Sequence, residues 1–365
     1  MDNKVMMTVF EGGREDSEIE QQMRDVRHAV LLDNLQKIYK IEGLGEIVLI
    51  SSYPDLLERA EKEGRVITRD VSGKAFHFGE ELQDVVASYK PKKLFYFGAA
   101  SFPLIEEVEL QNIVSRIQRE ENFVYTNNPQ SSDLAAFSPA DAIFRIEPPE
   151  NDNSLSISLR DQAGLEMELM PHSRGIFFDL DTPVDFLIYG DSPYAGKRVR
   201  KALEVMPLDY ELLEKAKEVL KGYYRDVALI GRVGAPLIAH LNCNLKLRLR
   251  IFSEERGMKA LGREAAGEVE LLLCYLVDEV GVEKFFRYLE KVAELAIIDT
   301  RVFFAHHKLK LPAEERYMAD LGQWEKLGNP WLKGFVRAAK GCKIPVLMGG
   351  HSLVSGGLWV LSQEL

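Results

Sequence analysis

The first half of the chain alternates short apolar runs with longer amphipathic stretches. The apolar runs have the length of buried strands and lie at residues 5–10, 46–51, 93–97 and 123–126. The stretches around them carry apolar residues at helical spacing and lie at residues 18–41, 54–62, 80–89 and 106–119. Strands that alternate with helices predict a mostly parallel sheet covered on both faces. In such sheets, ligands bind outside the carboxyl ends of the strands.

The second half has a different pattern. From residue 209 onward, β-branched runs are rarer and helical patterns follow one another at residues 210–221, 264–280, 282–297, 313–321 and 331–339. A chain of 365 residues is long enough for two domains. We therefore expect an α/β domain with a mostly parallel, Rossmann-like sheet at residues 1–192, followed by a mainly α-helical domain at residues 193–365.

Composition narrows the setting in which the protein works. The net charge of −11 argues against general binding to nucleic acid or to an anionic membrane surface. No apolar run approaches the roughly 20 residues that a membrane-spanning helix needs. The three cysteines, Cys243, Cys274 and Cys342, are far apart and form no Cys-x-x-Cys pair. This spacing predicts neither a disulfide framework nor a zinc site, and it favours a reduced, cytoplasmic location. The sequence leaves the oligomeric state open.

The strongest candidate for chemistry is the segment 177–187, in which an apolar run ends in Asp-Leu-Asp-Thr-Pro. In a strand, residues i and i+2 point to the same face, so Asp179 and Asp181 would be directed at one ion. The Thr-Pro pair is typical of a helix start, because Thr is a good N-cap and Pro suits the first turn. Asp185 falls within that helix, where we expect it at the surface.

The order of the motifs over about residues 4–190 resembles the nucleotidyltransferases that build nucleotide-diphospho compounds, such as nucleotide-diphospho-sugar transferases and molybdenum-cofactor guanylyltransferases. The Asp-x-Asp-Thr-Pro segment resembles their closing metal-site motif, which implies magnesium at Asp179 and Asp181. Gly12, Gly13 and Arg14 stand where the family has its glycine-rich phosphate loop, which implies nucleotide binding. The acids at residues 15–16 and the missing third glycine depart from that loop.

Two further segments carry the resemblance. Residues 97–104 resemble a Gly-Asp-x-Pro-Leu segment whose aspartate is a magnesium ligand in relatives, but this chain has Ser101 and no carboxylate at that place. Asn128 and Asp133 lie in a segment that contacts the acceptor substrate in relatives. The resemblance thus implies that Ser101, Asn128 and Asp133 bind substrate. A polar loop closed by an Asx turn is the alternative interpretation.

A second candidate site lies near the end of the chain, where a glycine-rich turn at residues 349–357 follows the apolar run 344–348. A strand followed by such a turn can hold a phosphate through backbone amides. The side chain of His351 is suited to acid or base chemistry. The candidate residues are Gly350, His351, Ser352, Ser355 and Gly356. The alternative is a tight turn whose small residues serve helix packing.

Three hypotheses about function follow. The first is an enzyme that transfers a nucleotidyl group from a nucleoside triphosphate to a phosphorylated acceptor with magnesium, releasing pyrophosphate. The second is a regulatory protein that binds a nucleotide or sugar nucleotide without turnover, as the missing carboxylate suggests. The third places the function in the second half, at an anion site around residues 349–357 with Arg256 and Arg301. In the first two, the partner is a nucleotide or sugar nucleotide, neither nucleic acid nor membrane.

Overall fold

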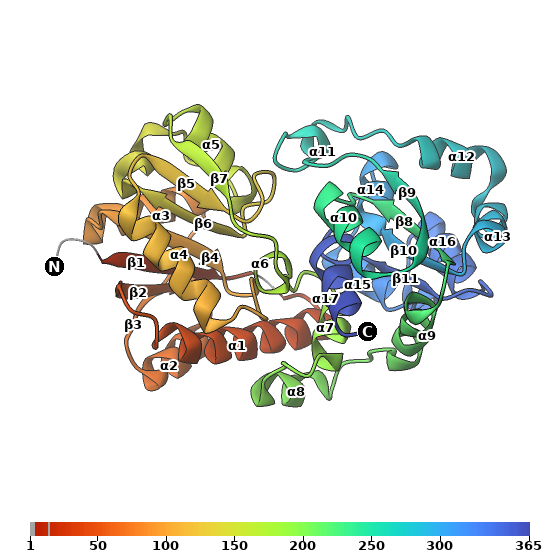
Figure 1. Ribbon diagram of the computed structural model, residues 1–365, viewed down its shortest axis with the longest axis horizontal. Coiled ribbons are helices and arrows are strands. Elements are labelled where there is room, and N and C mark those ends of the chain that lie inside the picture. Colours follow the sequence, from red (N-terminus) through yellow and green to blue (C-terminus); the bar gives the residue numbers. More distant parts are fainter. Residues whose placement is uncertain (1–3, 14) are drawn as a thin grey trace. The chain divides into compact units, whose positions relative to one another are not determined.

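The computed structural model describes residues 4–13 and 15–365 (Figure 1). Contacts divide the chain into two units. The first comprises Met1–Arg14, Arg27–Ile176 and Lys259–Leu261, and the second comprises Glu15–Val26, Phe177–Met258 and Gly262–Leu365. The sequence predicted a boundary after residue 192, whereas the contacts assign residues 177–192, with the Asp-x-Asp-Thr-Pro motif, to the second unit.

The first unit contains a seven-stranded sheet in the order β3-β2-β1-β4-β6-β5-β7. Neighbouring strands are parallel except for β6, which runs antiparallel to β4 and β5. The expected mostly parallel α/β architecture is confirmed. The strands are β1 (Val5–Glu11), β2 (Leu44–Ser51), β3 (Val66–Asp70), β4 (Lys93–Gly98), β5 (Phe123–Thr126), β6 (Leu134–Ser138) and β7 (Glu166–Leu169).

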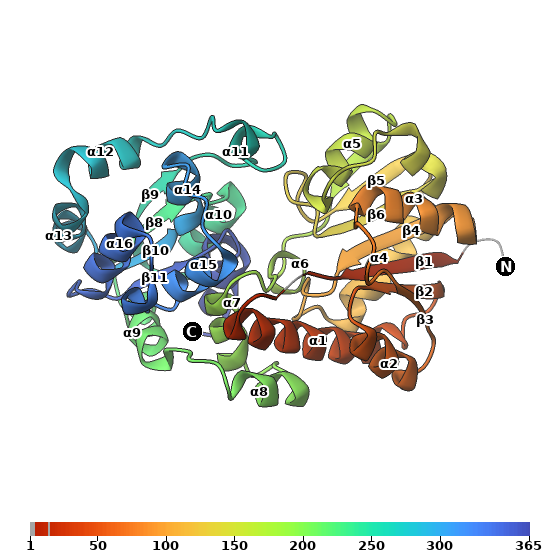
Figure 2. The ribbon, with the colours of Figure 1, turned by 180° about the vertical axis from the view of Figure 1, so that it is seen from behind.

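Helices cover both faces of this sheet. Figure 1 shows α4 in front of the strands, and Figure 2, seen from behind, shows α3 in front of them. The apolar stripes of these amphipathic helices are buried, for example Leu82 and Val85 in α3 and Leu110 and Val114 in α4. The helices are α2 (Pro54–Glu63), α3 (Phe78–Tyr89), α4 (Glu107–Arg119), η1 (Ala140–Arg145), η2 (Asp152–Ser154), α5 (Leu155–Asp161) and α6 (Arg174–Phe177); α1 (Glu18–Ile38) begins in residues of the second unit.

The second unit is rich in helix, as expected, but its centre is a parallel four-stranded sheet that the sequence pattern did not predict. The strand order is β11-β10-β8-β9. The strands are β8 (Arg225–Gly231), β9 (Leu247–Ser253), β10 (Leu295–Asp299) and β11 (Val346–Gly349). Most of β10 had been included in the helical pattern 282–297. A fully buried run of this length has no alternation, so periodicity cannot separate it from a buried helical segment.

Helices also cover both faces of the second sheet. Figure 2 shows α15 and α16 in front of the strands, and Figure 1 shows α10 and α17 there. The helices are α7 (Pro183–Asp191), α8 (Lys197–Leu203), α9 (Tyr210–Lys221), α10 (Ala235–Asn244), α11 (Arg263–Ala266), α12 (Leu272–Val280), α13 (Val282–Val292), α14 (Thr300–His306), α15 (Ala313–Asp320), η3 (Trp324–Lys326), α16 (Pro330–Lys340), the π-helix η4 (Leu353–Gly357) and α17 (Leu358–Gln363). No helix in the described part of the chain has the length and apolar character to cross a membrane.

Candidate ligand site at the edge of the second sheet

The glycine loop of the first unit lies at the carboxyl edge of the seven-stranded sheet. Because β1 and β4 are parallel neighbours, Gly12 and Gly13 at the end of one strand and Ser101 after the other follow adjacent strand ends. Both glycines are exposed, and the Gly13 amide is 3.5 Å from the Ser52 Oγ atom. Arg14 lies outside the described residues. Nucleotide binding by this loop stays a prediction.

The predicted substrate residues of the first unit bond to nearby loop residues. The Asn127 side chain donates to the Asp133 carboxylate at 3.2 Å, and Asn128 accepts from the Gln130 amide at 3.0 Å. The Ser101 hydroxyl is 3.4 Å from the backbone oxygen of Asp133. The structure thus brings Ser101 and Asp133 together, and it uses Asn128 to close an Asx turn.

The Asp-x-Asp-Thr-Pro motif is built differently from the predicted strand. The short helix α6 occupies residues 174–177, and an extended segment follows it. Asp179 is partly buried, whereas Asp181 is exposed. The Thr-Pro pair begins α7 as predicted, since Thr182 caps the helix and Pro183 opens it. Whether Asp179 and Asp181 share an ion stays a prediction.

The expectation that Asp185 lies at the surface is wrong. Its side chain is fully buried, because its carboxylate closes a capping box on α7. One carboxylate oxygen accepts from the Thr182 amide at 2.7 Å and from the Thr182 hydroxyl at 2.8 Å. Burial raises the pKa of Asp185 to about 8, and the charge of Asp181 adds to that rise. Asp185 is therefore a neutral acid at physiological pH, with a structural role.

The turn 349–357 packs against the segment 177–182, so two motifs far apart in the sequence meet in the second unit. The Ser352 hydroxyl donates to the backbone oxygen of Asp179 at 2.8 Å. A Cβ on Gly356 would lie 2.0 Å from the backbone oxygen of Phe177, and one on Gly350 would lie 3.0 Å from the Thr182 methyl group. These glycines permit close chain packing, which supports the structural interpretation of the turn.

Two of the polar side chains predicted for the second anion site already donate to backbone oxygens. The Ser355 hydroxyl donates to the backbone oxygens of His351 and Ser352, at 2.8 and 3.2 Å. The Ser352 side chain is buried on Asp179. The imidazole of His351, by contrast, is only partly buried and forms no hydrogen bond or ion pair with the residues that the structure describes. Of the predicted residues in this turn, His351 is therefore the one available to a ligand.

The strand order places a topological switch point beside His351. From β8 the chain passes to β9 on one side and then to β10 on the other, so the crevice lies between the carboxyl ends of β8 and β10. Arg232, directly after β8, forms a bidentate pair with Asp299 at the end of β10, at 2.6 and 3.1 Å. Asp299 is fully buried and also caps α14 through the Arg301 amide. Although burial favours the neutral acid, Arg232 holds the pKa of Asp299 below its usual value.

A second guanidinium lies beside this pair. Arg256, in the loop after β9, is 3.5 Å from the backbone oxygen of Arg232 and forms no ion pair within the described part of the chain. A Cβ on Gly234 would lie 2.7 Å from an Arg256 nitrogen. Gly234 is the N-cap of α10 and provides no side-chain cap, so Arg256 lies at the positive end of that helix. Burial and the charge of Arg232 lower the pKa of Arg256.

These charges act on His351. Burial lowers the pKa of His351 to about 4, and the charges of Arg232 and Arg256 act in the same direction. Asp299 and Asp181 oppose them. The imidazole is therefore neutral at physiological pH, with one nitrogen able to donate and the other able to accept a hydrogen bond. The edge of the second sheet thus combines two guanidiniums, a helix N-terminus and a neutral histidine, an arrangement suited to binding an anion.

The other arginine proposed from the sequence, Arg301, forms an ion pair elsewhere. It bonds to the buried Asp320 at 2.6 and 2.9 Å and to the Thr300 hydroxyl at 2.8 Å. Sequence reasoning missed Arg232, because β8 was not predicted. The signal for it is the sequence Gly-Arg-Val-Gly-Ala-Pro at residues 231–236, directly after the apolar run 227–230. That pattern is a strand, a glycine turn and a helix start.

Comparison with known proteins gives structural neighbours only. No family model and no curated protein matches the chain. A nucleotidyl transferase from Methanothermobacter thermautotrophicus is 15% identical, over 51% of this chain and 95% of its own, with a TM-score of 0.37. A cytidylyltransferase from Leptospira borgpetersenii is 13% identical, over 56% of this chain and 94% of its own, with a TM-score of 0.37. A CMP:2-keto-3-deoxy-manno-octonic acid synthetase complexed with CTP is 10% identical, over 50% and 94%, with a TM-score of 0.36.

The names of two of these neighbours, a nucleotidyl transferase and a cytidylyltransferase, match the class of enzyme that the sequence motifs resemble. At such identities and TM-scores, the likeness carries no conclusion about ligand or reaction. The chain is similar over about half of its length to solved nucleotidyltransferase and cytidylyltransferase structures.

Proposed function

We propose that the protein binds a nucleotide together with magnesium at the carboxyl edge of the second sheet, and that it functions as a nucleotidyltransferase-like protein. One observation carries this proposal. Arg256 lies beside a second arginine, at the N-terminus of α10, and has no acidic partner among the described residues. Two neighbouring guanidiniums repel each other, so an anion between them relieves the repulsion.

The phosphate groups would bind where donors converge. Arg256 offers a planar fork of N–H groups, and the first turn of α10 offers backbone amides that no side chain caps. Arg232 is held by Asp299 in a bidentate ion pair, which leaves Arg256 as the main cationic donor to the ligand. The neutral His351 would bond to a part of the ligand outside the phosphates, because a neutral imidazole both donates and accepts.

Asp181 fits the role of a magnesium ligand. Its carboxylate is exposed and is neutralised by no cation among the described residues, yet its charge acts on both His351 and Asp185. Magnesium prefers oxygen ligands and typically takes one or two carboxylates together with phosphate oxygens. When bound, the ion would supply positive charge to the phosphate groups. The residues of this edge would position the nucleotide and exclude part of its water.

Nucleotidyl transfer would join the α-phosphorus of a nucleoside triphosphate to a phosphate oxygen of the acceptor, with loss of pyrophosphate. The second candidate place for the triphosphate is the loop of Gly12 and Gly13, which is exposed at the end of β1. Binding without release of pyrophosphate would identify the regulatory alternative. The two places and the two activities are separated by the measurements below.

The test is a thermal-shift panel of nucleoside triphosphates and sugar nucleotides, with and without magnesium. A ligand at one hundred times its dissociation constant stabilises a protein by about 2.7 kcal/mol. We expect a magnesium-dependent shift that is lost in Asp181→Ala and Arg256→Gln. Arg119→Gln makes the same change in charge at an exposed site on α4 and should keep the shift. No shift with any nucleotide, or an equal shift in all variants, would contradict the proposal. A pyrophosphate-release assay on the wild type then separates transfer from binding.

A further inference from the structure

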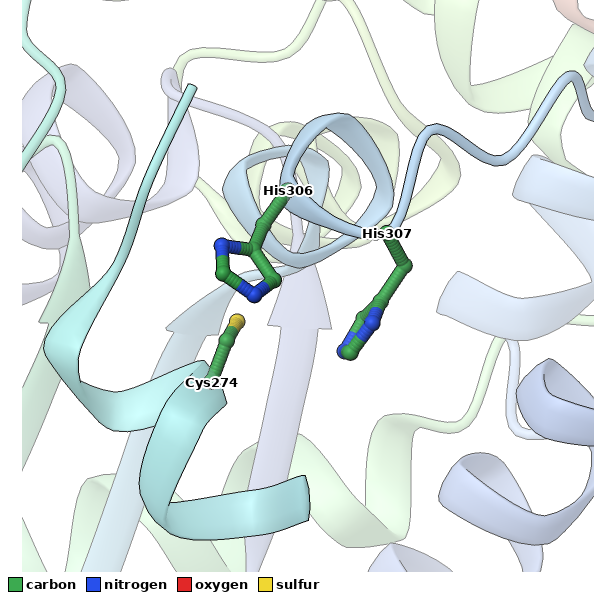
Figure 3. Close-up of side chains that lie close together, drawn as sticks. All are labelled: Cys274, His306 and His307. Carbon is green, nitrogen blue, oxygen red and sulfur yellow. The ribbon is translucent and has the colours of Figure 1, made fainter. Parts of the chain in front are cut away.

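A second cluster of chemically active side chains lies on α12 and at the C-terminal end of α14, apart from the proposed nucleotide residues. Cys274, His306 and His307 each offer one ligand atom, and these atoms all lie within 4.8 Å of one another (Figure 3). The Cys274 thiol is free and buried. The side chains of His306 and His307 are 7% and 14% exposed. Three potential ligands with so little solvent contact form a compact site.

We propose that this cluster binds a divalent transition metal of the zinc class, through the sulfur of Cys274 and one ring nitrogen each of His306 and His307. A ring nitrogen of His306 faces the Cys274 sulfur in Figure 3. The Nε2 atom of His307 is buried without a hydrogen-bond partner in the described structure, so it is the nitrogen of His307 available to a metal. Thiolate and imidazole are the ligands that zinc prefers, whereas magnesium prefers oxygen.

A carboxylate lies close to a ring nitrogen of each histidine. A Glu270 oxygen is 3.5 Å from Nδ1 of His306, and an Asp278 oxygen is 3.8 Å from Nε2 of His307. A carboxylate beside Nδ1, like Glu270, commonly orients a histidine that binds metal through Nε2 and strengthens it as a ligand. Asp278 lies beside the metal-binding nitrogen of His307 instead and adds negative charge there. The Leu271 amide donates to Nδ1 of His306 at 3.1 Å. If Nε2 of His306 bound the metal, Nδ1 would carry the proton and could no longer accept from the Leu271 amide. Nδ1 would then donate to the Glu270 carboxylate, and the amide would need another acceptor.

The charge around the cluster favours a cation. Burial raises the pKa of Cys274, and the negative charges of Asp278, Glu254 and Glu270 raise it further. The same carboxylates attract a divalent ion, and a bound ion deprotonates a coordinating thiol. Three protein ligands would leave a fourth position for water or a carboxylate oxygen.

The experiment is a titration of the chelator-stripped, full-length protein with cobalt(II), followed by absorption. We expect a thiolate-to-cobalt charge-transfer band and intense visible bands of tetrahedral cobalt, which saturate at one ion per chain and disappear when zinc is added. Cys274→Ser should abolish the charge-transfer band. The matched control is Cys243→Ser, because Cys243 is an exposed free thiol and its loss should leave the spectrum intact.

Loss of the band in Cys274→Ser would also follow if that variant misfolded, so a second variant outside the ligand set is needed. Glu270→Gln leaves all three ligands in place and removes the carboxylate beside Nδ1 of His306, so it should weaken zinc binding by about 10–100-fold. Circular dichroism would check that Cys274→Ser is folded. Wild-type protein that gives no charge-transfer band, or a band that survives in Cys274→Ser, would overturn the proposal. Nucleotide binding uses other residues, so its outcome does not affect this one.

Discussion

The low pKa of His351 predicts a loss of stability in acid. The unfolded chain takes up a proton on this histidine near its ordinary pKa of 6.5, whereas the folded protein does so only near 4. Between these values the unfolded state binds more protons, so the free energy of unfolding falls as the pH falls from 6.5 to about 4. At about 1.4 kcal/mol per pKa unit, this interval corresponds to a loss of about 3 kcal/mol.

The variant His351→Gln removes this proton binding and keeps a polar side chain. Urea unfolding followed by tryptophan fluorescence is a suitable assay, because all three tryptophans, Trp324, Trp331 and Trp359, lie in the second unit. As the pH falls from 6.5 to about 4, the free energy of unfolding of wild type should fall by about 3 kcal/mol relative to that of the variant. Ser352→Ala, which removes a neighbouring group that does not titrate, should differ from wild type by a constant amount. Parallel pH profiles for wild type and His351→Gln would refute the reasoning.

Three further predictions concern stability. Asp299→Asn breaks a buried ion pair and should cost about 3–5 kcal/mol, whereas Asp226→Asn breaks ion pairs with exposed arginines and should cost under about 1 kcal/mol in the same urea assay. Gly356→Ala should destabilise the second unit by more than about 3 kcal/mol, because the new Cβ would lie 2.0 Å from a backbone oxygen. The control is Gly334→Ala, whose Cβ would lie in open space within α16 and which should stabilise the unit by about 1 kcal/mol. The folded state keeps the proton of Asp185 up to about pH 8, whereas the unfolded chain releases it near 3.8. The free energy of unfolding of wild type should therefore fall as the pH rises from 4 to 8, and in Asp185→Asn this fall should be absent.

The sequence predicted the first unit well because its elements alternate in kind. The runs that became β1 and β5 are short, apolar and separated by amphipathic helices, so length and periodicity agree. The second sheet was missed for the opposite reason. Its central strand β10 is fully buried and closely follows an amphipathic helix, α13. The apolar residues of the two elements form one continuous pattern, so the transition from helix to strand could not be recognised.

The candidate site could be predicted only in part. His351 was found through its glycine-rich surroundings, and Arg256 through its acidic neighbours in the sequence. The pairing of Arg232 with Asp299 depends on which strand ends become neighbours, and the strand order is a property of the folded sheet. The burial of Asp185 also escaped prediction, because the first turn of a helix is exposed in most contexts and α7 instead lies against β11.

The location of the bound nucleotide is the most direct test of the account. Hydrogen exchange, read by mass spectrometry with and without a nucleoside triphosphate and magnesium, reports on both strand edges in one experiment. The account predicts slower exchange at residues 231–236 and 349–353, the turns that follow β8 and β11, and no change at residues 11–17. Protection confined to residues 11–17 would contradict it and would assign the nucleotide to the glycine loop of the first unit.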